Sequence, residues 1–263
     1  MKDLVKIGSE TAKGGFANED KIAEKFEAWK TDKEAQKWLT IMKYDLKKIK
    51  QVEAVVLSNK YKADVQIKVL IRMEKAIGVQ NISIKKANDD SDFNQADKRW
   101  VDKYGEMWNL PDTLTELLKI FSGEVSPQEL LREHKINKEK YDSLKDKRRF
   151  FLTEFKEKNV KKLVDFFRKH KIKIVADIIK GEGDFSADWM LVTKYYKSKN
   201  ETEWILKDIN YAMNVFGNGD VVVTPRGSLH IGRIAMQRKG GDGGRKTANM
   251  LQFKISPCDL FKY

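Results

Sequence analysis

The stretches DVQIKVLI (residues 64–71) and NISIKK (residues 81–86) decide the expected fold. In the first stretch every second residue is apolar, which is typical of a β-strand with one buried face. Ile82 and Ile84 repeat this alternation in the second stretch. The segment 74–78 between them is short enough for a hairpin turn and too short for a helical crossover. The two stretches therefore predict neighbouring strands joined as a β-hairpin.

Helical and extended patterns alternate along the rest of the chain. The spacing of apolar residues predicts helices over residues 19–30, 33–43, 96–108, 111–121, 126–134 and 146–170. Extended patterns predict strands over residues 52–57, 189–195, 204–206, 220–224, 229–236 and 248–255. Together they indicate an α/β (α+β) fold in which helices flank a mixed β-sheet. We expect one domain over residues 1–263, with an insertion at 123–141, where the sequence is polar.

Composition limits the class of protein. The 263 residues include 52 Lys and Arg against 39 Asp and Glu, a formal net charge of +13. Because the basic residues are spread along the chain and not gathered on one amphipathic helix, they favour nucleic acid over a membrane as the partner. A basic protein without a polyanionic partner is the alternative.

The cysteine content and the apolar runs indicate the compartment. Cys258 is the only cysteine, which excludes an internal disulfide and favours a reducing compartment such as the cytoplasm. The apolar runs are too short to span a bilayer, and the segment after Met1 has no secretory apolar core. We therefore expect a cytoplasmic protein without a membrane partner.

Asp64, Ser83 and Lys85 form a candidate catalytic group. Hydrolysis of a phosphodiester needs a carboxylate to hold Mg²⁺, a water molecule as nucleophile and a cation to orient that water. Asp64 begins the first strand of the hairpin, and 18 residues separate it from Ser83. Alternation along the second strand places Ser83 and Lys85 on one face, so Lys85 and Asp64 can converge. The alternative is an exposed strand face with ordinary polar groups.

This order of residues resembles the PD-(D/E)xK pattern of nucleases, in which an aspartate is followed by an acid, any residue and a lysine. Ser83 departs from the pattern, because a neutral hydroxyl binds Mg²⁺ more weakly than a carboxylate does. Glu19, in the first predicted helix, is a candidate for the missing anionic ligand. The backbone carbonyl of Ile84 is another candidate ligand, since it requires no particular side chain.

The last predicted strand and the turn before it have the composition of DNA-reading elements. In MLQFKI (residues 250–255), alternation places Gln252 and Lys254 together on one face, where they can contact base edges. The turn TPRGS (residues 224–228) presents Arg226 beside a glycine, which permits a close approach to DNA. The alternatives are a solvated sheet face and a turn that only closes a hairpin.

A third such segment, DFNQADK (residues 92–98), precedes a predicted helix. Its aromatic residue, Phe93, can wedge between base pairs, and its two amides, Asn94 and Gln95, can read them. The alternative is a helix N-terminus with Phe93 packed inward. The basic run Asp146 to Arg149 can lie along phosphates, although a solvated charge run is the more common reading of such a sequence.

Taken together, these stretches resemble the type II restriction endonucleases, in particular the group of the Haemophilus enzyme that cuts GCGC and, more distantly, MspI. The resemblance runs almost from end to end. It rests on residues 8–30, 54–64, 93–100, 104–108, 146–155, 183–192, 225–233 and 237–255.

The resemblance implies a restriction-endonuclease-like fold and Mg²⁺-dependent cleavage of double-stranded DNA at a short GC-containing palindromic or near-palindromic site, GCGC or GC-N-GC. Asp64 falls on the metal-binding aspartate of the family and Lys85 on its catalytic lysine. The recognition segments of the family fall on Phe93, Asn94, Gln95, Lys98, Arg226, Ser228, Gln252 and Lys254. It also implies a cognate DNA methyltransferase in the same cell and is compatible with a homodimer.

Two other functions are weighed against this one. A nuclease fold that has lost activity, as marked by Ser83, would be a non-catalytic sequence-specific DNA-binding protein. An RNA-binding module would need a pair of exposed stacking aromatics on a sheet, and the sequence has no such pair.

Overall fold

The computed structural model describes residues 17–57, 66–183, 186–196, 200–241 and 245–263. Within these ranges the chain forms two compact units that are interleaved in sequence. Unit 1 comprises residues 95–178 and 216–255, and unit 2 comprises the described residues up to 94 together with 179–215 and 256–263. The expected single domain, with its insertion at 123–141, stays a prediction.

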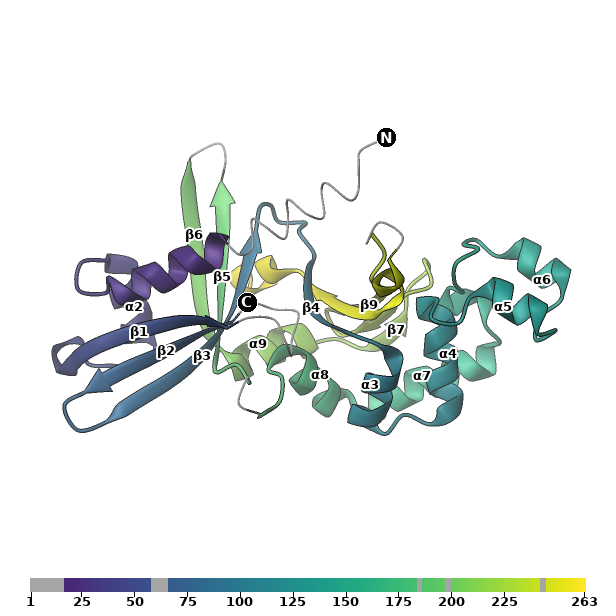
Figure 1. Ribbon diagram of the computed structural model, residues 1–263, viewed down its shortest axis with the longest axis horizontal. Helices are drawn as coiled ribbons and strands as arrows, with labels where there is room; N and C mark the ends of the chain where they lie inside the picture. The colour runs from purple at the N-terminus through teal and green to yellow at the C-terminus, as the bar shows by residue number, and fades with distance from the viewer. Residues whose placement is uncertain (1–16, 58–65, 184–185, 197–199, 242–244) are drawn as a thin grey trace. The chain divides into compact units, whose positions relative to one another are not determined.

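Unit 2 is built on a five-stranded mixed sheet (Figure 1). Its strands, in spatial order, are β1 (Ile49–Leu57), β2 (Gln66–Met73), β3 (Ile77–Ala87), β5 (Trp189–Tyr196) and β6 (Glu201–Asp208). All neighbours are antiparallel except β3 and β5, which run parallel. The expected hairpin of β2 and β3 is confirmed, and β3 lies in the middle of the sheet.

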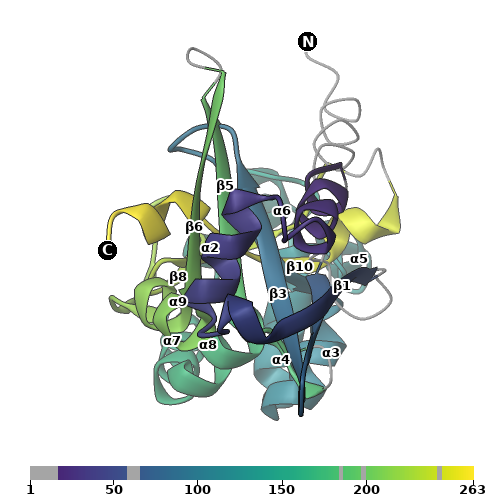
Figure 2. The ribbon, with the colours of Figure 1, turned by 90° about the vertical axis from the view of Figure 1, so that its left-hand side faces the viewer.

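Two helical segments cover one face of this sheet, which explains why alternate residues of β2 and β3 are apolar. Helical residues 17–27 and α2 (Lys33–Ile41) share a core with the sheet, and Figure 2 shows α2 lying over it. Asp32 caps α2 by accepting hydrogen bonds from the backbone N–H groups of Glu34 and Ala35. Burial of each large apolar side chain in this core contributes about 1.5–3 kcal/mol.

Unit 1 contains a second five-stranded sheet. Its strands, in spatial order, are β4 (Asn94–Arg99), β10 (Leu251–Ile255), β9 (Ile234–Arg238), β8 (Leu229–Ile231) and β7 (Val221–Val223). Its helices are α3 (Val101–Trp108), α4 (Asp112–Ser122), α5 (Pro127–Arg132), α6 (Lys138–Ser143), α7 (Glu157–Lys169) and α8 (Lys171–Ile179). The ring of Tyr104 stacks on that of Trp108, with 4.8 Å between the ring centroids, and packs edge-on against that of Phe253, with 5.2 Å between the centroids.

The remaining elements are short helices. They are η1 (Leu46–Lys48), η2 (Leu152–Glu154), α9 (Ile209–Gly217), η4 (Lys246–Asn249) and η5 (Pro257–Phe261). In unit 2, η5 packs against β3, β5 and β6. In the described part of the chain, no helix is both long and apolar enough to cross a membrane.

The expected α/β class is confirmed, although the described residues form two sheets where one mixed sheet was expected, and four predicted elements differ. The strand expected over 248–255 begins only at Leu251, because residues 246–249 form η4. Residues 94–99 form β4 and not the first part of a helix. The strand expected over 229–236 is a hairpin, β8 and β9, with Gly232 in its turn at φ +59°. The helix expected over 146–170 begins only at Glu157, after an irregular segment and η2.

Candidate active site and DNA-contacting residues

Ser83 and Lys85 lie next to each other on one face of β3 and are both buried. Ser83 is 1% exposed and Lys85 is 4% exposed. Ser83 pairs with Gln66 on β2, and Lys85 pairs with Val192 on β5. The residue between them, Ile84, alternates to the other face and joins the core of unit 2. An exposed strand face with ordinary polar groups, the alternative considered above, is therefore not what the structure contains.

The other residues expected at this site are Asp64 and Glu19. Asp64 lies outside the described residues, two positions in sequence before Gln66. Glu19 belongs to helical residues 17–27 and is 5% exposed. This helix contributes Ile22 and Phe26 to the core that contains Ile84. A carboxylate buried to this degree on a helix that packs against β3 has the chemistry of a ligand or a positioning group.

The oxygen atoms available here are of the kind that Mg²⁺ binds. Carboxylate, hydroxyl and backbone carbonyl oxygens are its usual protein ligands, and the ion keeps several water molecules. Glu19, Ser83 and the Ile84 carbonyl are donors of these three kinds, although the helix of Glu19 packs on the Ile84 face of β3 and Ser83 points to the other face. Within the described ranges, no group of three or more His, Cys, Asp or Glu side chains is placed to hold a metal. The donor set thus fits Mg²⁺ in its chemistry, and a site there would include Asp64.

Sequence reasoning missed a second buried lysine on the same face. The parallel register pairs Lys85 with Val192 and Ala87 with Lys194, so Lys85 and Lys194 point to the same side of the sheet. Lys194 is 7% exposed, and its Nζ donates to Asp90 at 2.6 Å. Hydrogen bonds to Asp90 and Tyr196 raise the pKa of Lys194 above its usual value. A residue 104 positions away supplies the partner, so no local pattern could have indicated this pair.

The turn after β3 holds Phe93 and Asn94. Asn88 donates to the Asp92 carboxylate through both its backbone N–H, at 2.6 Å, and its side-chain amide, at 3.1 Å. The Asn94 amide donates to the carbonyl of Lys86 at 2.7 Å. Phe93 is 44% exposed at the start of β4, so the alternative of a helix N-terminus with this ring packed inward is wrong. Phe93 has the exposure that a wedge residue needs.

On β10, Gln252 and Lys254 differ in their surroundings. Gln252 is 4% exposed, and its amide nitrogen donates to the carbonyls of Arg238 at 3.2 Å and Lys239 at 3.4 Å. Lys254 is half-buried, and burial lowers the pKa of its ammonium. In the described part of the chain, the Lys254 side chain has no hydrogen bond or ion pair. The burial of Gln252 contradicts the solvated sheet face considered as an alternative, whereas Lys254 is partly exposed.

The turn with Arg226 and Ser228 is held by a glycine. Gly227 has φ +78°, and a Cβ atom there would lie 2.6 Å from the Cβ of Phe151. Its carbonyl accepts a hydrogen bond from the N–H of Leu152 at 2.9 Å. Arg226 is exposed and Ser228 is half-buried. The turn thus presents an exposed guanidinium from a fixed backbone.

Two residues expected to contact DNA, Gln95 and Lys98, lie on β4. Both are half-buried, and the buried positions of the strand are Ala96 and Asp97. Among the described strands β4 is at the edge of its sheet, next to β10. The structure therefore places Lys98 on a strand where a helix was expected over residues 96–108, and Gln95 on the same strand just before that range.

The chain has a buried lysine near a buried serine on a central strand, and it has exposed basic turns. Several classes of enzyme that act on polyanions could have these features. Comparison with protein families decides between them, since the family model described as R.HinP1I restriction endonuclease matches residues 42–261. The chain belongs to the R.HinP1I restriction endonuclease family. It is therefore a type II site-specific deoxyribonuclease. The matched range contains Ser83 and Lys85, whereas Glu19 lies outside it.

A solved structure agrees with the R.HinP1I family in its fold. The crystal structure of restriction endonuclease MspI in complex with its cognate DNA matches with a TM-score of 0.56. The match covers 91% of this chain and 88% of the MspI chain at 15% identity, so it supports the fold alone. Among curated proteins none matches this chain.

Proposed function

We propose that this R.HinP1I-family chain hydrolyses double-stranded DNA in a Mg²⁺-dependent reaction at a short GC-containing palindromic or near-palindromic site, GCGC or GC-N-GC. The observation that carries the proposal is the buried pair Ser83 and Lys85 on the central strand β3, opposite the end of β2 that follows Asp64 in sequence. A buried ammonium beside a candidate metal site is the arrangement that in-line attack by water requires.

Each residue has a distinct role in this proposal. Lys85 donates a hydrogen bond to the attacking water and, through its charge, stabilises the phosphate as negative charge develops. Asp64 and the backbone carbonyl of Ile84 would hold Mg²⁺, and Ser83 and Glu19 would complete its surroundings. When bound, Mg²⁺ polarises the phosphate and makes water a better nucleophile. The water oxygen bonds to phosphorus while the P–O bond in line with it breaks, and the leaving oxygen takes up a proton.

The proposed DNA contacts come from the exposed and partly buried residues of the three segments. We assign Phe93 as a wedge between base pairs. The residues assigned to base contacts are Asn94, Gln95, Lys98, Arg226, Ser228, Gln252 and Lys254. The exposure of Phe93 and Arg226 supports their assignment. The assignment of Lys254 is supported because its side chain has no partner among the described residues. The amide nitrogen of Gln252 is already bonded, so its oxygen is the atom that would read a base.

The proposal includes a biological setting. A cell with this nuclease needs a cognate DNA methyltransferase that protects its own sites, and both act in the cytoplasm. A palindromic site has a two-fold axis, which a homodimer would match. Methylated substrate that is still cut at the proposed site would contradict the pairing with a methyltransferase.

Cleavage by variants at the site tests the catalytic assignment. Asp64→Asn and Lys85→Ala should abolish the formation of discrete fragments from plasmid DNA in Mg²⁺, while binding of duplex without Mg²⁺ stays within a few-fold of the parent. Lys86→Ala is the matched control, because Lys86 is next to Lys85 but alternates to the other face. Cutting by Lys85→Ala at the parental rate would overturn the assignment, and gel shifts without any cleavage by the parent would indicate a DNA-binding protein.

A second experiment determines the site itself. Sequencing of the fragment ends from one digested genome gives the recognition sequence and the cut position. GCGC or GC-N-GC at every end supports the proposal, and any unrelated consensus overturns this part of it.

A further inference from the structure

Three arginines of unit 1 lie near one carboxylate, that of Asp146, and two of them pair with it. Arg148 forms a bidentate pair with Asp146, with Nε 2.8 Å from Oδ1 and Nη2 3.0 Å from Oδ2. Arg149 reaches the same carboxylate only through Nε, at 3.7 Å from Oδ2. Burial and repulsion from Arg148 lower the pKa of Arg238, and the charge of Arg238 in turn lowers the pKa of Arg149. We call these three residues the arginine cluster, which carries more positive than negative charge.

Arg149 is the member whose hydrogen-bonding groups are least satisfied. Its side chain is 15% exposed, and its Nε and Nη1 atoms are buried without a hydrogen bond in the described part of the chain. The guanidinium lies 4.2 Å from the centre of the Phe151 ring and 5.5 Å from that of Phe121. Burial, together with repulsion from Arg238 and Arg148, lowers its pKa. A buried cation in this position would be stabilised by an additional acceptor with negative charge.

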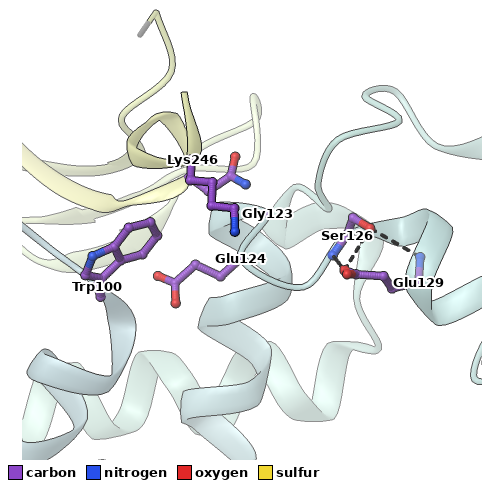
Figure 3. Close-up of a pocket in the computed structure, with 7 residues that line it drawn as sticks. Trp100, Gly123, Glu124, Ser126, Glu129 and Lys246 are labelled. Atoms are coloured by element: carbon purple, nitrogen blue, oxygen red, sulfur yellow. Dashed lines mark hydrogen bonds between the residues drawn. The ribbon is translucent and has the colours of Figure 1, made fainter. Parts of the chain in front are cut away.

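Arg238 is held in place at the edge of a cavity. Its Nε and Nη2 atoms donate to the Asn249 side-chain oxygen at 3.2 and 2.6 Å. Gly123 packs against it, and a Cβ at this glycine would lie 3.5 Å from Arg238 Nε and 2.5 Å from the Arg148 carbonyl. Gly123 and Asn249 line a cavity of about 410 Å³, around which Figure 3 also shows Lys246. Glu124 and Glu129 also line this cavity, so the residues that connect it to the cluster are Gly123 and Asn249 and not the arginines themselves.

The cluster is connected to the proposed recognition turn. The N–H of Leu152 donates to the carbonyl of Gly227 at 2.9 Å, and Gly227 follows Arg226 in the turn. The segment 148–152 thus carries two cluster arginines at one end and the contact with this turn at the other. A group bound by the cluster would fix the position of the turn, which is how phosphate contacts set the register of base contacts.

We propose that Arg148, Arg149 and Arg238 bind a backbone phosphate of the DNA substrate. This inference rests on the DNA binding in the proposed function and names a contact that the base-reading residues do not include. A phosphate supplies several acceptor oxygens and a full negative charge, and the planar guanidinium fork matches its geometry. The phosphate belongs to no particular base, so the contact adds affinity without adding sequence preference.

The salt dependence of binding tests the proposal. The probe is a duplex without the proposed site, in buffer without divalent metal, and the dissociation constant is measured across a range of salt concentrations. Arg149→Gln and Arg238→Gln should each reduce the magnitude of the slope of log K against log salt, and the double variant should reduce it by about 0.9, the value for one lost phosphate contact. Arg168→Gln is the matched control, because Arg168 is an exposed arginine on α7 that pairs with Asp165 at 3.1 Å.

Further variants separate the outcomes. Circular dichroism and thermal unfolding verify that each variant is folded. If Arg149→Gln does not fold, Arg149→Lys replaces it in the test: this variant keeps the charge and should retain most of the parental slope. Folded cluster variants with the parental slope overturn the proposal, as does an equal loss of slope in Arg168→Gln. Stabilisation by inorganic phosphate that Arg149→Gln abolishes, with an unchanged DNA slope, would assign the cluster to a free anion instead. A parent that binds no DNA would contradict the proposed function itself.

Discussion

The ammonium of Lys194 lies 2.6 Å from a carboxylate oxygen of Asp90, which connects β5 to the turn that follows β3. The Lys194 side chain is 8% exposed, whereas that of Asp90 is 73% exposed. The Cys258 thiol contacts the same turn at the carbonyl of Asp89, at 3.4 Å. Since the turn joins the strand of Lys85 to Phe93, this ion pair connects the candidate catalytic strand with a candidate recognition residue.

Removal of this ion pair should affect cleavage more than folding. In Lys194→Met, we expect a loss of about 1 kcal/mol in stability, because the Asp90 carboxylate stays hydrated when its partner is lost. The rate of cleavage at the cognate site should fall about tenfold, a change of about 1.4 kcal/mol, since the turn with Phe93 loses its tether. Single-turnover cleavage and urea unfolding measure the two effects. Lys103→Met, at an exposed pair on α3, is the control and should change neither; a parental cleavage rate in Lys194→Met would exclude the tether.

Ser83 should matter far less to cleavage than Lys85 does. Its hydroxyl is neutral and would be a weak ligand, so Ser83→Ala removes little charge from the site. Its side chain is 1% exposed, and alanine fits the same space. We expect single-turnover cleavage by Ser83→Ala to stay within about tenfold of the parent, roughly 1.4 kcal/mol. A variant as inactive as Lys85→Ala would show that this hydroxyl is essential and that the assigned roles are wrong.

Gly232 should tolerate no side chain. Its φ is +59°, and a Cβ there would lie 2.6 Å from the carbonyl oxygen of Gly217 and 2.7 Å from that of Asn218. Both neighbours are backbone, so Gly232→Ala should cost about 3 kcal/mol, from the left-handed conformation and the steric overlap together. Gly241→Ala is the control, since Gly241 has φ +72° and a Cβ added there would meet nothing within 4 Å. Chemical denaturation should show that Gly241→Ala loses only about 1 kcal/mol of the free energy of unfolding. Equal losses in the two variants would contradict the role of steric overlap at Gly232.

His230 should make the protein less stable as the pH falls below neutral. Burial on β8 lowers the pKa of its imidazole below the ordinary value of 6.5. Below pH 6.5 the unfolded chain therefore binds a proton that the folded chain does not, and stability falls until the pH reaches the folded-state pKa. Above pH 6.5 His230 is neutral in both the folded and the unfolded chain, so it no longer makes the stability depend on pH. Urea midpoints from about pH 8 to about pH 5 should fall more steeply in the parent than in His230→Gln, and parallel curves would exclude this histidine as the source.

The strands of the candidate active site could be predicted from sequence because their information is local. Alternation from Ile67 to Ile71 and at Ile82 and Ile84 reflects one buried face, and the short connection specifies a hairpin. Once the strand is fixed, the common face of Ser83 and Lys85 follows from geometry alone.

Strand β4 could not be predicted, because its sequence, NQADKR, contains no apolar alternation. Its buried residues are Ala96 and Asp97. The Asp97 carboxylate accepts hydrogen bonds from Arg99 and from the Tyr104 hydroxyl, both at 3.0 Å. The Tyr104 partner lies in the next helix, and β10 supplies the neighbouring strand from the far end of the chain. Tertiary contacts therefore stabilise this strand, and a local pattern does not contain them.

The functional pairs missed by sequence reasoning have the same origin. Lys194 meets Asp90 across 104 residues, and Arg149 meets Arg238 only in the folded unit. Gln252 was expected beside Lys254 on a common open face, and the alternation is correct. Its amide is buried because the carbonyls of Arg238 and Lys239, at the end of β9, approach it, and no alternation pattern contains this contact.

The interleaving of the two units has a consequence for biosynthesis. A ribosome releases the chain from its N-terminus, and the sheet that carries Lys85 needs β5 and β6, which are made only after residues 95–178 of the other unit. Residues 256–263, whose helix η5 packs on β3, β5 and β6, follow the second segment of that other unit. Nascent chains that end before β5 therefore lack two strands of the sheet that contains Lys85, and this sheet can be completed only after the first segment of the other unit has been made.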